Sequence, residues 1–112
     1  MFSKVFYTDL LIPERFAGMT LGPFVFIRPS YKDDIGLLNH ELTHVKQFWK
    51  NPLMGLLYQF SKKYRLQYEA EAYNTQLKYA PSRLDLFAGY LVSNYNLQIT
   101  LDEARQAILS AV

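Results

Sequence analysis

The chain has no cysteine, only two histidines and no long apolar run. Without cysteine, neither a disulfide framework nor a thiolate metal site can stabilise the fold. The longest apolar stretch, PLMGLLYQF at residues 52–60, is less than half as long as a membrane-spanning helix requires. The first residues, MFSKVFYTDLLIPERF, place charges among apolar side chains and lack the continuous hydrophobic segment of a secretory signal. The sequence therefore predicts a cytoplasmic protein.

An excess of charge of one sign is also lacking, because 12 basic and 10 acidic residues leave a formal net charge of +2. No basic run or glycine-interrupted aromatic pattern is present, so we expect no binding to nucleic acid. Half of the residues are hydrophobic and 16% are aromatic, as in a packed globular protein. With 112 residues and no linker or internal repeat, residues 1–112 are expected to form a single domain.

The hydrophobic period changes once along the chain, which predicts an α+β fold that is mostly helical. Up to about residue 28, short β-prone runs alternate with turn residues, and FVFI at residues 24–27 is the best strand. We expect a small N-terminal antiparallel sheet or hairpin there. The rest reads as helices at 35–50, 53–62, 64–79, 82–95 and from about 100 onward. Asp33 or Asp34 would cap the first helix, and SRLD (82–85) and TLDE (100–103) resemble capping boxes.

The first of these helices carries LLNHELTHVKQ, which contains both histidines of the chain. On an α-helix His40 and His44 project from the same face, one turn apart, and can share one metal ion. Neutral imidazole is a common ligand of Zn²⁺. Glu41 lies about 100° around the helix, at the rim of the same site, where a general base for a zinc-bound water is needed.

The alternative is that the two histidines are ordinary core or surface residues, since HExxH also occurs by chance. Leu38, Leu42, Val45 and Trp49 form an apolar stripe on the opposite side of the helix, and Leu37 and Phe48 lie beside the histidines. A helix that is buried on much of its circumference must supply a buried imidazole pair with a polar partner. A metal ion meets that need.

A catalytic zinc usually takes three protein ligands. Gln47 and Lys50 stand where the longer motif HExxHxxGxxH has its glycine and third histidine, so the third ligand is expected to be a carboxylate. Glu69 lies close to the apolar stripe of the third predicted helix, whereas Glu71 lies on its polar side. A carboxylate that faces the core is costly unless a cation meets it, which favours Glu69. The alternative for Glu69 is an ion pair with Arg65, one turn earlier.

HELTH followed by EAEAY resembles the gluzincin zinc metallopeptidases, in which a helix with HExxH meets a later helix that bears a glutamate ligand. Several of these families carry ExxAD on the later helix, and residues 69–73 match it with Tyr73 in place of the aspartate. The resemblance implies a minimal zincin domain, also of a kind found in bacteriophages, with zinc on His40, His44 and Glu69. It further implies that the strand in LGPFVFIRP lies over the active site as an edge strand.

Two functions of different classes follow from this pattern. The first is a zinc-dependent hydrolase of peptide bonds in peptides or proteins, with Glu41 as general base. The second is a catalytically silent, zinc-stabilised binding or assembly module, which the short chain favours. A structural zinc site has no need of a glutamate beside its ligands, and this favours the hydrolase. Candidates for an oxyanion donor are Tyr73, Tyr79, Arg83, Tyr90 and Tyr95, which the sequence does not rank.

Two further expectations concern single segments. The hydroxyl of Tyr73 is expected to take the place of the missing aspartate and to orient a metal ligand, and a packing role is the alternative. The aromatic-rich segment FWKNPLMGLLYQFSKKY, residues 48–64, has the pattern of an interfacial membrane contact. We favour a core helix with a basic end for this segment.

Overall fold

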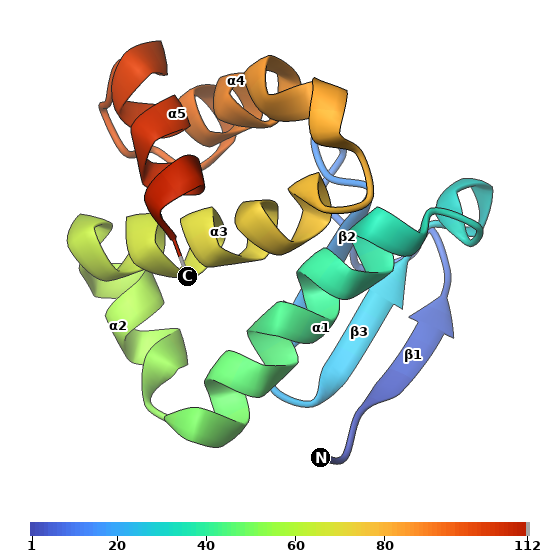
Figure 1. Ribbon diagram of the computed structural model, residues 1–112. Coiled ribbons are helices and arrows are strands. Elements are labelled where there is room, and N and C mark those ends of the chain that lie inside the picture. Colours follow the sequence, from blue (N-terminus) through green and yellow to red (C-terminus); the bar gives the residue numbers. More distant parts are fainter. Residues whose placement is uncertain (112) are drawn as a thin grey trace.

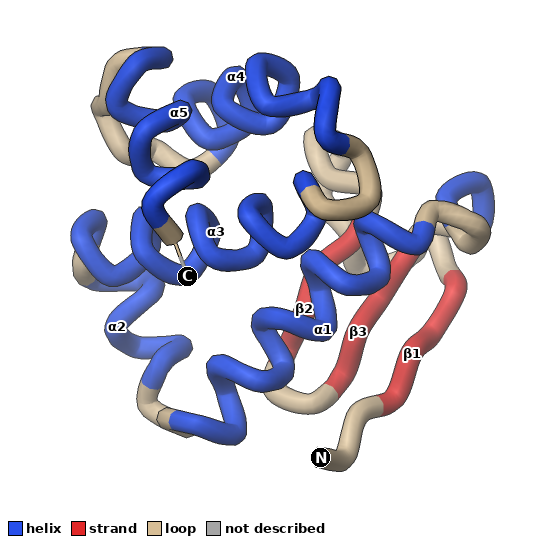
Figure 2. The backbone as a smooth tube through the Cα atoms, in the orientation of Figure 1, coloured by secondary structure: helices blue, strands red, loops and turns tan. Residues whose placement is uncertain are grey.

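The computed structural model describes residues 1–111 and has the α+β fold expected from the sequence (Figure 1). A three-stranded sheet near the N-terminus is followed by a run of helices (Figure 2). The elements are β1 (Lys4–Tyr7), β2 (Gly18–Leu21), β3 (Phe24–Ile27), α1 (Ile35–Lys50), α2 (Met54–Phe60), α3 (Lys62–Leu77), α4 (Leu84–Asn94) and α5 (Leu101–Ser110). Within residues 1–111 no helix combines the length and the apolar character needed to cross a bilayer.

The sheet has the strand order β1-β3-β2 and is mixed, whereas a small antiparallel sheet or hairpin was expected. β2 and β3 form the expected antiparallel hairpin, whose turn contains Gly22 at φ 58°, a conformation that glycine adopts without strain. β1 pairs with β3 in parallel. The alternating pattern that identifies these strands specifies which face is buried, but it carries no information on strand direction.

One face of the sheet packs on α1, which runs in nearly the same direction as β3 in Figure 1. Val25 and Ile27 of β3 are almost completely buried and contact a cluster that includes Leu37 and Val45 of α1. The phase of α1 is close to the predicted one, because Leu38 and Leu42 also pack against this cluster. Trp49 departs from the prediction: its side chain is half-exposed, and its indole Nε1 donates to the carbonyl of Phe2.

The helix boundaries differ from the predicted ones mainly where two helices are joined closely. The predicted capping box at Ser82 is wrong, because the chain forms a 3₁₀ turn at Pro81–Arg83 and continues into α4 without a side-chain cap. Pro81 suits the first turn of a helix, so the helical path begins before Ser82. The capping box between Thr100 and Glu103 at the start of α5 is confirmed.

The helix expected at residues 53–62 is confirmed as α2 (Met54–Phe60), but its expected place in the core is wrong, because α2 contains no buried residue. Next to it, α3 runs from Lys62 with Ser61 as its N-cap, and therefore starts and ends about two residues earlier than predicted. Buried apolar side chains fall instead into two clusters. One joins the sheet to α1, and the other joins α3, α4 and α5 through Tyr73, Phe87, Leu91, Leu97 and Ile108.

A first prediction concerns the start of α1, the helix that carries both histidines. The side chain of Asp34 accepts a hydrogen bond of 2.9 Å from the backbone N–H of Leu37, whereas Asp33 is exposed. Asp34→Ala should lower the free energy of unfolding by about 1 kcal/mol, the usual value of an N-cap. Asp33→Ala is the matched control and should leave the melting temperature unchanged. Equal losses in the two variants would contradict the assignment of the cap.

Candidate metal centre

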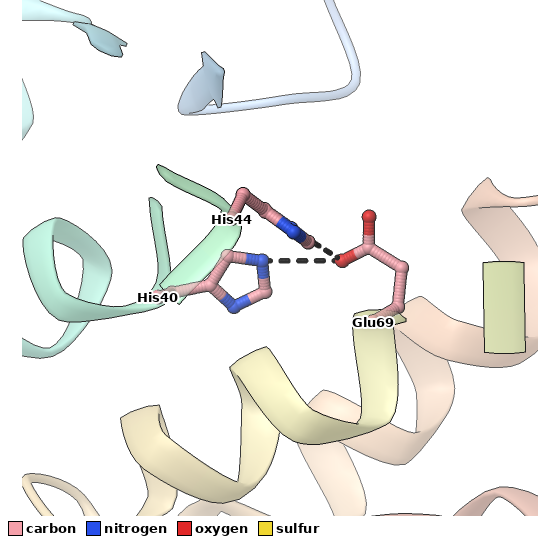
Figure 3. Close-up of side chains that lie close together, drawn as sticks. All are labelled: His40, His44 and Glu69. Atoms are coloured by element: carbon pink, nitrogen blue, oxygen red, sulfur yellow. Dashed lines mark hydrogen bonds and ion pairs between the residues drawn. The ribbon is translucent and has the colours of Figure 1, made fainter. Parts of the chain in front are cut away.

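His40 and His44 project from α1 toward Glu69 of α3 (Figure 3). The Nε2 atoms of both imidazoles lie 3.2 Å from the same oxygen, Oε1 of Glu69. All three residues are buried, with exposed fractions of 4%, 8% and 3%. The three residues predicted as ligands are thus brought together, and among residues 1–111 they form a group whose ligand atoms lie within 4.8 Å of one another.

Gln47 determines which nitrogen of His44 carries hydrogen. Its amide Nε2 donates to the carbonyl of Tyr68 at 3.0 Å and to Oε1 of Glu71 at 3.2 Å. Both partners are acceptors, so the amide orientation is fixed and Gln47 Oε1 faces His44 Nδ1 at 2.8 Å. His44 Nδ1 must therefore donate its hydrogen to Gln47 Oε1. In a neutral His44, Nε2 then carries no hydrogen, and its lone pair is directed at the Glu69 carboxylate. A cation has to lie between these two acceptors, either a proton on Nε2 or a metal ion.

The pKa values of His44 and Glu69 agree with a proton between them when metal is absent. Burial by itself lowers the pKa of His44, but the charge of Glu69, together with hydrogen bonds to Glu69 and Gln47, raises it to about 9. Burial opposes the charged form of Glu69 as well, and the two histidines nevertheless hold its pKa well below the usual value. His44 and Glu69 thus form a buried ion pair, and a metal ion would displace the proton of His44.

The three side chains fit a zinc ion. Two imidazole nitrogens and one carboxylate oxygen are a common donor set for Zn²⁺, and tetrahedral ligands at the usual bond lengths lie about 3.3 Å apart. The separations of 3.2 Å between the imidazole nitrogens and the Glu69 oxygen are close to this value. The buried Nδ1 of His40 has no hydrogen-bond partner among residues 1–111. His40 is thus oriented by packing, since its ring contacts that of Tyr73 edge to face at 4.4 Å.

Glu41 lies beside the triad and is held by β2. The residue is 5% exposed, and Oε1 accepts a hydrogen bond of 2.8 Å from the hydroxyl of Thr20. Gly18 lies against it: a Cβ at this position would touch Oε2 of Glu41 at 3.4 Å, an ordinary contact distance, and would crowd the carbonyl oxygen of Phe26 at 3.1 Å. The strand therefore determines both the position of this carboxylate and how closely the sheet approaches it.

Three tyrosines lie near the triad, and the one that bonds to a predicted ligand is Tyr58, not Tyr73 as expected. The hydroxyl of Tyr58, in α2, donates to Oε2 of Glu69 at 2.5 Å. The hydroxyl of Tyr73, which we expected to orient a ligand, instead exchanges a hydrogen bond of 2.8 Å with Tyr95. Burial, reinforced by the negative charge of Glu69, raises the pKa of all three tyrosines, so their hydroxyls stay protonated.

The contacts of Arg65 and Glu71 differ from the alternative roles expected for the two glutamates. Arg65 donates to the backbone carbonyls of Tyr58, Gln59 and Tyr95, so its guanidinium is not the partner of Glu69. Glu71 is outside the triad, as predicted, but it is only partly exposed because it accepts from Gln47. Glu71 therefore supports His44 through Gln47 and is more than a solvated surface charge.

Two cavities lie beside His40 and Glu41. One, of about 390 Å³, has a mixed polar and apolar lining that includes Asp34, Arg83 and Tyr90. The other, of about 370 Å³, is mainly apolar and is lined by Leu21, Phe48 and Met54 among others. The residues common to both are Phe16, Gly18, His40, Glu41 and Tyr95. An elongated ligand that occupies both cavities would pass directly over His40 and Glu41.

The strand beside the apolar cavity is β2, and the expectation that FVFI at 24–27 is the edge strand over the site is wrong. β3 is the central strand and pairs on both sides, so its backbone has no free edge. Every residue of β2 lines the apolar cavity. A weakly β-prone sequence such as GMTL gave no reason to select this strand, although an edge position is where such a strand is expected.

Comparisons of the chain with protein-family models, with curated proteins and with solved structures find no match. The assignment of the site therefore depends on the residues and their geometry alone.

A second prediction tests the ligand set. Protein loaded with zinc and then dialysed should contain one ion per chain, because two imidazoles and a buried carboxylate converge on one point. His44→Ala and Glu69→Ala should lose this zinc, as measured by elemental analysis. Glu71→Ala is the matched control on the same helix and should retain it. Full zinc occupancy in Glu69→Ala would contradict the assignment.

A third prediction separates the two tyrosines. Tyr58→Phe removes the hydroxyl that donates to Glu69, and loss of such an outer hydrogen bond typically weakens metal binding by about 10–100-fold. Tyr73→Phe should have a smaller effect, because the hydroxyl of Tyr73 bonds to Tyr95. Competition with a chromophoric chelator measures both affinities. The opposite order of the two effects would restore the sequence-based assignment to Tyr73.

Proposed function

We propose that the protein is a zinc-dependent hydrolase of peptide bonds, with His40, His44 and Glu69 as the zinc ligands. The observation that carries this proposal is the position of Glu41, a buried carboxylate held by Thr20 beside the triad and lining both cavities. A structural metal site has no use for such a group, whereas a hydrolytic site needs a base at this position. The expected cytoplasmic location is part of the proposal.

Each group of the chain then has a separate task. Bound zinc supplies a Lewis acid that polarises the scissile carbonyl and lowers the pKa of water. Glu41 accepts the proton of the attacking water and returns it to the amine that leaves. The hydroxyl of Thr20 lies within hydrogen-bond distance of both Oε1 and the backbone carbonyl of Glu41 and so holds the carboxylate in place. Tyr58 keeps the carboxylate of Glu69 turned toward the histidines.

Among the candidates for an oxyanion donor, Tyr95 has the best position. It lines both cavities together with His40 and Glu41, and its hydroxyl stays protonated. Tyr73 can accept from Tyr95 or donate to it, and when it donates, the proton of Tyr95 is free for a substrate oxygen. Tyr79 is half-exposed and lies in a separate cavity beside Asp33, away from the triad.

The substrate in this proposal is an extended peptide added to the free edge of β2. Main-chain hydrogen bonds to an edge strand hold a peptide without regard to its sequence, and alternate side chains enter pockets on the same face. The apolar cavity beside Leu21, Phe48 and Met54 would accept a large apolar side chain. The position of β2 next to Glu41 brings the peptide bond close to the base.

The second candidate function is a zinc-stabilised binding or assembly module without catalysis. It is favoured by α2, where the exposed side chains of Leu56 and Phe60 are free to contact a partner. The two candidates make different demands on Glu41, because only the hydrolase requires its ability to accept a proton.

The fourth prediction uses this difference. Glu41→Gln keeps the size of the side chain and its hydrogen bond from Thr20 while it removes the proton acceptor. Zinc content and melting temperature should stay at the wild-type level, and the rate of cleavage of an unfolded protein such as casein should fall by about 10²–10⁴-fold.

Thr20→Val, which removes only the hydroxyl that holds Glu41, is the positional control and should reduce the rate less. If zinc-loaded wild-type protein cleaves neither casein nor a peptide library, the binding module is the better description.

A further inference from the structure

We propose that α2 and the lysines beside it form a docking surface for an anionic lipid bilayer. This inference does not depend on the hydrolase or on zinc. It starts from α2, in which residues of the apolar segment PLMGLLYQF lie on the outside of the protein. In Figure 1, α2 lies at the periphery of the molecule, beside the C-terminal end of α1.

Three large apolar side chains line one side of this segment. Leu53, Leu56 and Phe60 are spaced three and four residues apart, so they follow one stripe of the helix. Their exposed fractions are 64%, 60% and 85%. At 85% exposure Phe60 projects from the surface rather than lying against it.

The segment that carries this stripe has charge of one sign. Residues 42–68 contain no acidic side chain, and their basic side chains are Lys46, Lys50, Lys62, Lys63 and Arg65. Arg65 donates to backbone carbonyls, and Lys62 donates to the side chain of Gln98. In the described part of the chain Lys46, Lys50 and Lys63 form no ion pair. Lys50 and Lys63 flank the apolar stripe at its two ends.

This combination fits the boundary of a bilayer that contains anionic lipids. Apolar side chains enter the boundary between head groups and acyl chains, and lysines at their sides meet the negative head groups. A second copy of the same chain is a poor occupant, because a two-fold interface through this stripe would bring the lysines of the two copies together. The charge therefore distinguishes a lipid surface from self-association.

Trp49 provides a reporter at the same end of the molecule. It is the single tryptophan of the chain, it is half-exposed, and it precedes Lys50 at the end of α1. Contact with a bilayer moves such an indole into a less polar environment. The emission of Trp49 should then shift to shorter wavelength when vesicles are added.

The fifth prediction is tested by sedimentation of the full chain with phosphatidylcholine vesicles, with and without phosphatidylserine. We expect binding to the vesicles that contain phosphatidylserine, a blue shift of Trp49 emission, and weaker binding at higher salt. The double substitution Leu56→Ser and Phe60→Ser should reduce the partition coefficient at least about tenfold, given the usual gain from burying such side chains. Lys50→Glu with Lys63→Glu should reduce it to a similar extent.

The control replaces two exposed leucines elsewhere, Leu10→Ser with Leu109→Ser, and should leave binding unchanged. Melting temperatures should stay near that of the wild type in all variants, because the replaced side chains are exposed. The proposal is overturned by a lack of binding to both kinds of vesicle, or by equal binding to both kinds. It is also overturned if the surface variants bind as the wild type does, or if the same surface proves to capture a second copy or an acidic protein instead.

Discussion

The contact between α1 and α3 through one carboxylate is the constraint on which the rest of the structure depends. Glu69 is 3% exposed, and a carboxylate at such a depth is stable only when cationic or strongly hydrogen-bonding groups surround it. His40 and His44 meet one of its oxygens and Tyr58 meets the other. α1, α2 and α3 must therefore approach one another at this point, and the apolar cavity lies beside it.

Helical periodicity was sufficient to predict this contact, because the residues that form it point to a different side of the helix from the residues next to them in the sequence. Glu69 and Glu71 are two residues apart, so a carboxylate directed at the core and one directed away from it can be distinguished by counting turns. Tyr58 could not be found in this way. Its contact with Glu69 depends on how the short helix α2 folds back between two longer ones, and the pattern of α2 suggested a buried helix.

The sheet shows the opposite relation between sequence and position. FVFI is the most β-prone stretch and was correctly predicted as a strand, but for the same reason it occupies the centre of the sheet. Central strands are buried and paired on both sides, whereas an edge strand tolerates glycine and polar residues. The strand that contacts Glu41 is thus the weaker one, and Gly18 and Thr20 act through close approach and one hydroxyl. Neither the close approach of Gly18 nor the hydrogen bond from Thr20 can be predicted from a periodic pattern of apolar residues.

The two hydrophobic clusters share no residue, and the buried triad lies where the helix of one cluster meets the helix of the other. This division has a consequence for folding cooperativity. α1 and α3 pack against each other along this junction, and the triad is its buried polar part, so separation of the sheet and α1 from the α3–α5 cluster would expose these three side chains to water. A metal ion bound to both helices would oppose this separation. Amide hydrogen exchange in α1 and in α4 would then report one shared opening event, and the ion would act as a cross-link between two half-cores in a chain that has no disulfide.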